Sequence, residues 1–228
     1  MSEQIKVELQ SFMGSDRQIA EAAWTSSFDL GKKELRSEED IKRVINLLAD
    51  EKHSVPFESV VFRFWLRLPI AIDRQHMTHR IASHSGMSGR YRTMPSDFLG
   101  MSEDVNNIFD KINYKTVNYE YNNMCKSSNE WYQEAVEQLK RGKQIGLISN
   151  DELKRAREFI RGVLPQHNMT ERVTVINLRA WANYYKLRHK PNAQKEIQYI
   201  AKAMLKEIKD KNVAPIALEC LERNNWII

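Results

Sequence analysis

The sequence predicts an α+β fold in which helices pack on an antiparallel sheet. Two observations carry that prediction. Residues 60–68, VVFRFWLRL, show the period-two alternation of a half-buried strand and are rich in aromatic and β-branched residues. The other long apolar patterns repeat at three- and four-residue steps, as on one face of a helix. The chain has no long linker, repeat or low-complexity segment, so residues 1–228 are predicted to form a single domain.

Each predicted element follows from a local pattern. The strand at 60–68 ends or bends at Pro69, which cannot donate a ladder hydrogen bond. Apolar spacing predicts helices at 40–51, 128–140, 150–163, 177–187 and 193–208. Asn150 is the expected cap of the third of these, since acidic residues fill the first turn after it. Residues 171–176, ERVTVI, are read equally as a short strand or as the start of the next helix.

Composition places the chain among globular proteins with a packed core. Hydrophobic residues make up 42% and charged residues 29%, and the formal net charge of +5 suits a protein that binds phosphates. No apolar run is long enough for a membrane helix, and the first residues lack a signal-peptide core. With two cysteines and no export signal, the predicted compartment is the reducing cytoplasm.

Several common sites are excluded by the motifs that the sequence lacks. It contains no GxGxxG or GxxxxGK[ST] phosphate loop, no CxxC pair and no HExxH, and the histidine spacings select no metal. Neither Cys125 nor Cys220 has the flanking pattern of a nucleophile. A non-catalytic nucleic-acid-binding module is the alternative class. The interspersed acidic residues and the lack of a helix-turn-helix, zinc finger or RNP pattern weigh against it.

One segment stands out chemically. Residues 74–92, RQHMTHRIASHSGMSGRYR, hold four arginines, three histidines, three serines, one threonine and two glycines. Arginine supplies fixed forks of donors for phosphate, serine supplies hydroxyl donors, and glycine lets backbone amides approach an anion. The alternative is a polar surface loop, but few loops need so many donors. The composition therefore predicts a nucleotide- or phosphate-binding segment.

The same segment closely resembles the signature RHRxxSxxxxSxR of flavin-dependent thymidylate synthases. The resemblance rests on His79-Arg80-Ile81-Ala82-Ser83, on Ser88-Gly89-Arg90-Tyr91 and, in order along the chain, on 53–58, 74–75, 161–165 and the block from 177 to 197. It implies reductive methylation of dUMP to dTMP. Methylenetetrahydrofolate would be the carbon donor, FAD the bound flavin and NADPH the reductant, with no cysteine nucleophile. It also implies a homotetramer whose sites are shared between subunits, with no membrane or nucleic-acid polymer as a partner.

The resemblance also implies a role for individual residues. The dUMP ligands would be Gln75, Ser88, Gly89, Arg90, Arg161 and Arg188. Flavin contacts would come from His53, His79, Arg80, Asn177, Arg179 and Asn183, and from the positions that Thr78 and Gly86 occupy here. Arg188 would be the catalytic residue, because a fixed cation beside the pyrimidine favours ionised N3. Ser88 is interpreted as a phosphate donor, since no Ser-His-acid pattern surrounds it.

Four positions depart from the family pattern. Thr78 replaces the first arginine of the signature, and Gly86 replaces a common glutamate. Trp24 and Asn192 stand where an arginine and a histidine are usual. The loss of a cation at Thr78 predicts weaker FAD binding. The departures also raise an alternative enzyme, a relative that hydroxymethylates or methylates dUMP or dCMP for modified viral DNA, in which case the compartment would be the host cytoplasm.

Overall fold

The computed structural model describes residues 4–25 and 36–227. Its Cα packing divides the chain into two compact units. Unit 1 holds residues 1–5, 67–75 and 86–172, and unit 2 holds residues 6–66, 76–85 and 173–228. The single domain over 1–228 stays a prediction. Among the described residues, no helix is long and apolar enough to cross a membrane.

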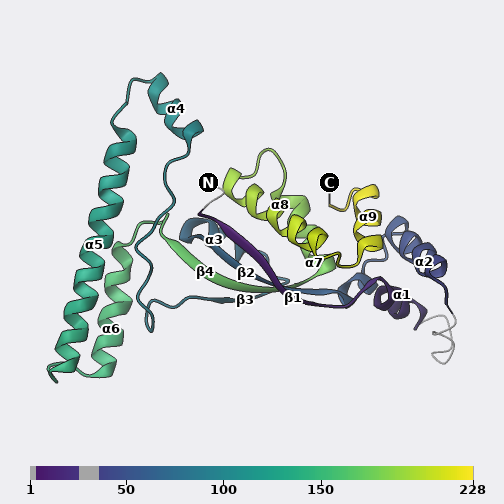
Figure 1. Ribbon diagram of the computed structural model, residues 1–228, viewed down its shortest axis with the longest axis horizontal. Coiled ribbons are helices and arrows are strands. Elements are labelled where there is room, and N and C mark those ends of the chain that lie inside the picture. The colour runs from purple at the N-terminus through teal and green to yellow at the C-terminus, as the bar shows by residue number, and fades with distance from the viewer. Residues whose placement is uncertain (1–3, 26–35, 228) are drawn as a thin grey trace. The chain divides into compact units, whose positions relative to one another are not determined.

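The described strands form one sheet of four, in the order β1-β2-β4-β3 (Figure 1). Their bounds are Lys6–Met13 for β1, Val61–Pro69 for β2, Ser83–Gly86 for β3 and Met169–Asn177 for β4. Its strands are antiparallel, and helices accompany them, so the α+β prediction is confirmed. The strand predicted at 60–68 is β2, and the apolar side chains at its alternate positions are fully buried. Residues 171–176 lie within β4 and do not begin the following helix.

Unit 2 contains helices from both the first and the last parts of the sequence. They are α1 (Asp16–Trp24), α2 (Glu38–Asp50), the 3₁₀ turn Val55–Ser59, α7 (Leu178–Arg188), α8 (Lys195–Asp210) and α9 (Pro215–Arg223). Helix α8 packs on β1 and α7. The buried rings of Phe62, Phe64 and Trp181 form the centre of the core, with Phe62 and Trp181 edge-to-face at 6.0 Å. This core fixes α7, which carries several of the predicted site residues.

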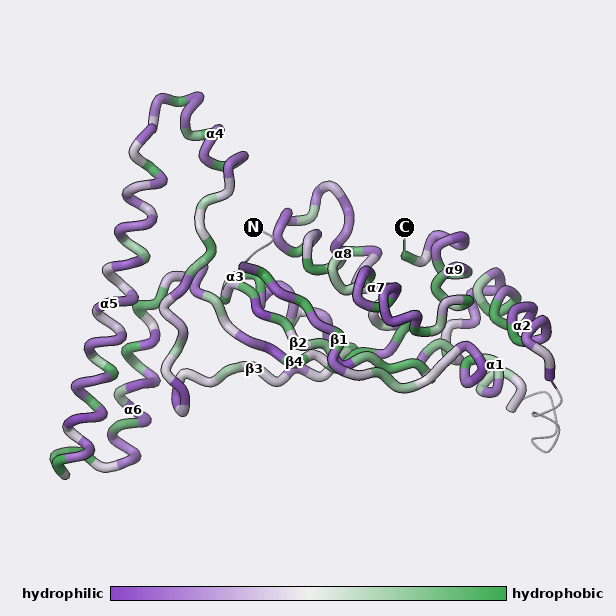
Figure 2. The backbone as a smooth tube through the Cα atoms, viewed as in Figure 1, coloured by the Kyte–Doolittle hydropathy of each residue, from purple (hydrophilic) through white to green (hydrophobic). Residues whose placement is uncertain are grey.

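Unit 1 is dominated by a helical hairpin. It contains α3 (Ile70–His76, whose last residue belongs to unit 2), α4 (Glu103–Lys111), α5 (Val117–Gln144), α6 (Asn150–Ile160) and the 3₁₀ turn Arg161–Val163. Helices α5 and α6 lie side by side (Figure 1). The α5 tube is largely hydrophilic with short hydrophobic bands (Figure 2). Its buried residues, Cys125, Asn129, Tyr132 and Val136, recur at helical spacing on one face.

The start of α6 corrects one prediction. The cap is Ser149, whose Oγ accepts a hydrogen bond from the backbone N–H of Glu152 at 3.2 Å. The Glu152 carboxylate accepts from the Ser149 N–H at 2.8 Å, which completes a capping box. Asn150 is therefore the first residue of the helix and not its cap.

Gly14 joins β1 to α1 in a conformation that other residues rarely adopt. Its φ is +97°, and a Cβ built there would lie 2.4 Å from the backbone oxygen of Ser59. Both features require glycine, because the close neighbour is backbone and cannot rotate away. The entry of the chain into α1 therefore depends on this residue.

We expect Gly14→Ala to destabilise the protein by about 1–3 kcal/mol, from left-handed strain and the backbone contact. The matched control is Gly142→Ala in α5, where a Cβ meets nothing nearer than 3.7 Å. That change should stabilise by up to about 1 kcal/mol, because alanine favours helix. Urea unfolding of both variants measures the difference. Equal stabilities would show that the backbone at Gly14 is not constrained.

Candidate functional site

The residues predicted to form the site fall into two groups, each of which lies mainly in one unit. Gln75, Gly86, Ser88, Gly89, Arg90 and Arg161 belong to unit 1. His53, Thr78, His79, Arg80, Asn177, Arg179, Asn183 and Arg188 belong to unit 2. The expected dUMP ligands other than Arg188 thus share one unit, and the expected flavin contacts other than Gly86 share the other.

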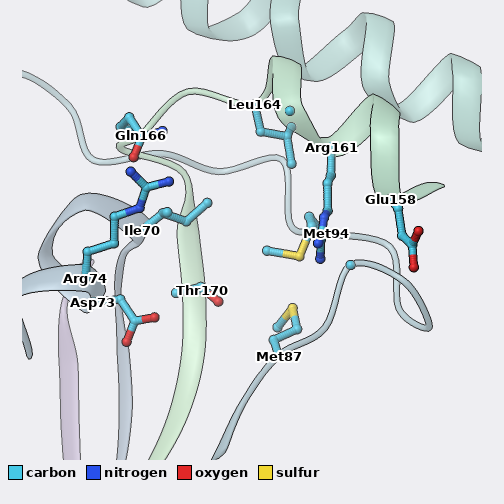
Figure 3. A pocket seen from close by; sticks show the side chains of 12 residues that line it. Ile70, Asp73, Arg74, Met87, Met94, Glu158, Arg161, Leu164, Gln166 and Thr170 are labelled. Carbon is cyan, nitrogen blue, oxygen red and sulfur yellow. The ribbon is translucent and has the colours of Figure 1, made fainter. Parts of the chain in front are cut away.

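Unit 1 contains a pocket of about 370 Å³ that includes two of the expected dUMP ligands, Gly89 and Arg161 (Figure 3). Arg161 lies beside Met94 on one side of the cavity, and Arg74 lies near Gln166 on the other. The two guanidinium groups and the glycine backbone that line this cavity suit a phosphate group. Arg74 lies in the donor-rich segment 74–92, but its sequence context alone predicts no role for it.

Arg161 and Gly89 are in direct contact. A Cβ at position 89 would lie 3.0 Å from Cδ of Arg161, so the arginine stem packs against the glycine backbone. Arg161 begins the 3₁₀ turn that follows α6, and Leu164 anchors that turn in a buried cluster with Met94. The position of the Arg161 guanidinium is therefore set by packing at its stem.

The segment from Ser88 to Thr93 is held by α6. The buried Arg157 donates to the Tyr91 carbonyl at 3.4 Å and to Oγ1 of Thr93 at 3.2 Å. Arg90 forms an ion pair with Glu158, which lines the same pocket. The sequence does not predict a role for Arg157 or Glu158, because nothing in their local pattern distinguishes them from other charged residues of a helix.

Gly86 is explained by its neighbour Arg172. The Arg172 guanidinium is buried and binds both carboxylate oxygens of Asp73, with Nη2 to Oδ2 at 2.5 Å. A Cβ at position 86 would lie 2.7 Å from Nη2 of Arg172. Any side chain at position 86 would therefore displace the buried ion pair, and this chain carries glycine there.

The central contact of unit 2 joins Arg188 to His79. Arg188 Nε donates to Nε2 of His79 at 2.8 Å, and Nη2 donates to Oγ1 of Thr78 at 3.1 Å. The pKa of His79 is lowered from 6.5 to about 4, chiefly by burial and also by the positive charge of Arg188 and by His84. His79 is therefore a neutral hydrogen-bond acceptor at neutral pH, and Arg188 keeps its full charge.

Asn177, Arg179 and Asn183, the predicted flavin contacts at or in α7, have different hydrogen-bond partners and surroundings. Asn177 caps α7, since its Oδ1 accepts from the Ala180 N–H at 2.8 Å. Arg179 donates to Glu58 at 2.6 Å. Arg179 and Asn183, four residues apart, both line a pocket of about 570 Å³ in unit 2. The expected flavin contacts are thus only partly brought together, and Arg80 is exposed in the loop after α3.

The chemistry of this second pocket fits a dinucleotide. Its lining residues are Lys52, Ser54, Arg179, Ala182, Asn183, Lys186, Asn224, Asn225 and Trp226. Lys52 and Lys186 supply cations for a diphosphate, and Arg179 would add a third by exchanging Glu58 for phosphate. The amide and indole groups suit a sugar and a base. His53 lines a different, more apolar pocket together with Trp24 and Val55, and its neighbour Ser54 lines both pockets.

The part of the chain that the structure describes offers neither a metal site nor an activated thiol. Within residues 4–25 and 36–227 no group of three or more His, Cys, Asp or Glu side chains is arranged to hold a metal. Both cysteines are buried, and burial raises the pKa of the Cys125 and Cys220 thiols. A raised pKa disfavours the thiolate, so neither cysteine is suited to act as a nucleophile.

The α+β fold and the cation-lined pockets fit a protein that binds nucleotides. A family model described as "Thymidylate synthase complementing protein" matches residues 8–216. The flavin-dependent thymidylate synthase of Thermotoga neapolitana is 32% identical over 213 residues, which cover 90% of this chain and 86% of the relative. That of Kosmotoga olearia is 34% identical over 218 residues, covering 93% and 88%. The chain therefore belongs to the flavin-dependent thymidylate synthase family.

A solved structure shows the same fold. The UMP/dUMP methylase PolB from Streptomyces cacaoi, bound with 5-Br dUMP, matches with a TM-score of 0.67 and 23% identity, over 96% of this chain and 95% of that one. Family membership confirms the prediction of an enzyme that transfers a methyl group to a pyrimidine nucleotide. The role of each predicted site residue stays a prediction.

We expect Arg188→Gln to raise the pKa of His79 above about 4, because one of the charges that lowers it is removed. The value should remain below 6.5, since burial is the larger cause. A pH titration of the histidine ¹⁵N resonances measures both values. A His79 pKa near 6.5 in the wild-type protein would contradict this description of the contact.

The same shift makes folding pH-dependent. Between pH 6.5 and about 4 the unfolded chain binds a proton at His79 that the folded chain does not. Stability from this residue is therefore lost as pH falls through that window, and His79→Gln should flatten the loss in urea unfolding.

Proposed function

We propose that this protein converts dUMP to dTMP by reductive methylation, with methylenetetrahydrofolate as carbon donor, FAD as bound flavin and NADPH as reductant. The observation that carries the proposal is the unit 1 pocket, where Gly89 and Arg161 line one cavity with Arg74. The relatives named flavin-dependent thymidylate synthase support the reaction. The similar structure of PolB, bound with 5-Br dUMP, supports the substrate.

In this proposal the unit 1 pocket binds the nucleotide phosphate. Arg161 and the Ser88–Arg90 segment donate hydrogen bonds to it. A phosphate dianion has more charge and more acceptor oxygens than one carboxylate, so it competes with Glu158 for Arg90. Arg157 keeps the segment in place while Arg90 changes partner.

The resemblance to the family gives Arg188 the chemical role. Its partner is a neutral imidazole, so its charge is not cancelled, as it would be beside a carboxylate. A fixed cation next to the pyrimidine stabilises the ring when N3 is ionised and C5 gains negative charge. The interaction strengthens as charge develops, so it lowers the barrier and does more than hold the substrate.

We propose that the unit 2 pocket binds part of FAD, with Arg179, Lys52 and Lys186 near its phosphates. Bound FAD would supply the reducing equivalents that it receives from NADPH. The protein's own part is to position and polarise, and no thiol takes part.

A second candidate is hydroxymethylation of the same ring, or reaction of dCMP. Gly86 favours it, because the Arg172 guanidinium occupies the space that the glutamate common in the family would need. Product analysis by mass spectrometry separates the candidates. With dUMP, methylenetetrahydrofolate, FAD and NADPH we expect dTMP, and no product from dCMP. Hydroxymethylated product, or turnover of dCMP alone, would replace the first candidate with the second.

We also propose a homotetramer. The helical hairpin of unit 1 exposes large apolar side chains, including Trp131 at 51%, Leu147 at 75% and Phe159 at 78%. The homotetramer is what the resemblance to the family implies, and these exposed side chains support a subunit interface on the hairpin.

Arg161→Ala should raise the KM for dUMP at least tenfold and leave kcat within a few-fold, because the phosphate does not change during the reaction. The control is Lys154→Ala on the preceding helix α6, which should change neither constant because the Lys154 side chain pairs with the exposed Asp151 outside the pocket. A kcat loss without a KM change would remove Arg161 from phosphate binding.

Arg188→Ala should lower kcat by roughly 10²–10³-fold at saturating dUMP, the size expected for one preorganised charge-stabilising donor. Arg188→Lys should recover only part of this, since an ammonium lacks the planar fork. Single-turnover rates, measured with FAD occupancy matched, give the comparison. Near-normal rates in Arg188→Ala would exclude the assigned role.

Thr78→Arg should tighten FAD binding about tenfold, the equivalent of one added charge-assisted hydrogen bond to phosphate. Without FAD the new cation lies beside Arg188, so the melting temperature of the apoprotein should fall. Thr78→Leu is the uncharged control, and fluorescence titration gives Kd. Equal Kd values for the two variants would mean that position 78 does not face the flavin phosphates.

A further inference from the structure

Four polar side chains form a continuous hydrogen-bonded chain inside unit 2. His84 Nδ1 lies 3.1 Å from Oγ1 of Thr174, and the same oxygen lies 2.9 Å from Nε2 of His76. His76 Nδ1 lies 3.2 Å from the hydroxyl of Tyr184. Three of the four are almost completely buried, and His84 is half-buried. We call these residues the histidine–threonine network.

A backbone oxygen fixes the direction of every bond in the network. His84 Nε2 lies 3.4 Å from the carbonyl oxygen of His79, and a carbonyl can only accept. With neutral imidazoles, Nε2 of His84 therefore carries the proton and Nδ1 accepts from the Thr174 hydroxyl. The Thr174 oxygen in turn accepts from Nε2–H of His76.

The last bond follows in the same way. Because Nε2 of His76 carries the proton, its Nδ1 accepts from the Tyr184 hydroxyl. Burial raises the pKa of Tyr184, so the hydroxyl keeps the proton that it donates. Each contact then has one donor and one acceptor, and reversing any one of them would place two acceptors or two donors together.

The network ends on His79, the residue that holds Arg188. It binds the His79 backbone through His84, and the Tyr184 ring packs edge-to-face on the His79 imidazole at 4.6 Å. The imidazole Nε2 accepts from Arg188 at 2.8 Å. Both the main chain and the ring of His79 are therefore fixed from the interior of the unit.

We infer that the histidine–threonine network, with Thr174 at its centre, positions His79 and through it Arg188. These four residues are positioning residues for the charge-stabilising arginine, and none of them needs to touch substrate. The inference rests on the proposed function for its link to turnover, whereas the hydrogen-bond order stands on the geometry alone.

Thr174 is the most informative position to change. Its single hydroxyl serves both imidazoles, so Thr174→Val keeps the shape and leaves two ring nitrogens without their partner. Thr174→Ser keeps the hydroxyl and is the rescue variant. Tyr184→Phe removes the far end of the network, and Tyr185→Phe, the next residue of α7 and also buried, is the matched control.

The test uses the full chain with FAD and dUMP and has two readouts. The first is ¹⁵N NMR, which should show His76 and His84 as Nε2–H tautomers and slow solvent exchange of the Arg188 Nε proton. The second is steady-state kinetics. In Thr174→Val we expect faster exchange of that proton and a kcat lowered roughly 10- to 100-fold, with little change in the KM for dUMP.

Tyr184→Phe should show smaller effects in the same direction, and Thr174→Ser and Tyr185→Phe should resemble the wild type. An Nδ1–H tautomer at either histidine would overturn the inference. So would a folded Thr174→Val variant with wild-type kcat and exchange. If the wild type does not methylate dUMP, the proposed function fails, while the tautomers and the Arg188 exchange rate still decide the inference.

Discussion

The chemistry proposed for this protein depends on the contact between Arg188 and His79. A guanidinium that pairs with a carboxylate loses most of its field, whereas one held by a neutral imidazole keeps it. Burial maintains that neutrality, and the charge of Arg188 reinforces it. The contact is thus self-consistent, because the cation stabilises the acceptor form of its own partner. The histidine–threonine network holds His79 in place from the core of unit 2.

The departures from the family pattern are best understood with their neighbours. Glycine at position 86 leaves room for the Arg172 guanidinium. Arg172 in turn depends on Asp73, since a buried guanidinium needs a carboxylate partner. Thr78 accepts a hydrogen bond from Arg188. Where the family signature has an arginine, this chain therefore has a neutral acceptor beside Arg188. Each substitution therefore changes a local arrangement of charge, and a glutamate introduced at position 86 alone would meet the Arg172 guanidinium.

The sequence predicted the elements that bury one face and leave the other more exposed. The alternation at 60–68 is visible because β2 is an inner strand with one fully buried face. The edge strands β1 and β3 were missed, since β1 buries only Leu9 and β3 buries no residue. The donors of 74–92 were found by composition. Their supports, such as Arg157 and Thr174, were not, because partners distant in sequence meet only after folding.

The most direct test of the central claim is the ionisation of N3 in bound dUMP, followed by ¹⁵N NMR of the N3-labelled nucleotide on the FAD-loaded protein. If Arg188 acts as an uncompensated cation beside the ring, the pKa of N3 should fall below that of free dUMP on binding. The decrease should disappear in Arg188→Gln, which keeps a hydrogen-bond donor and removes the charge. An N3 pKa unchanged on binding to the wild-type protein, or lowered equally in Arg188→Gln, would contradict the account.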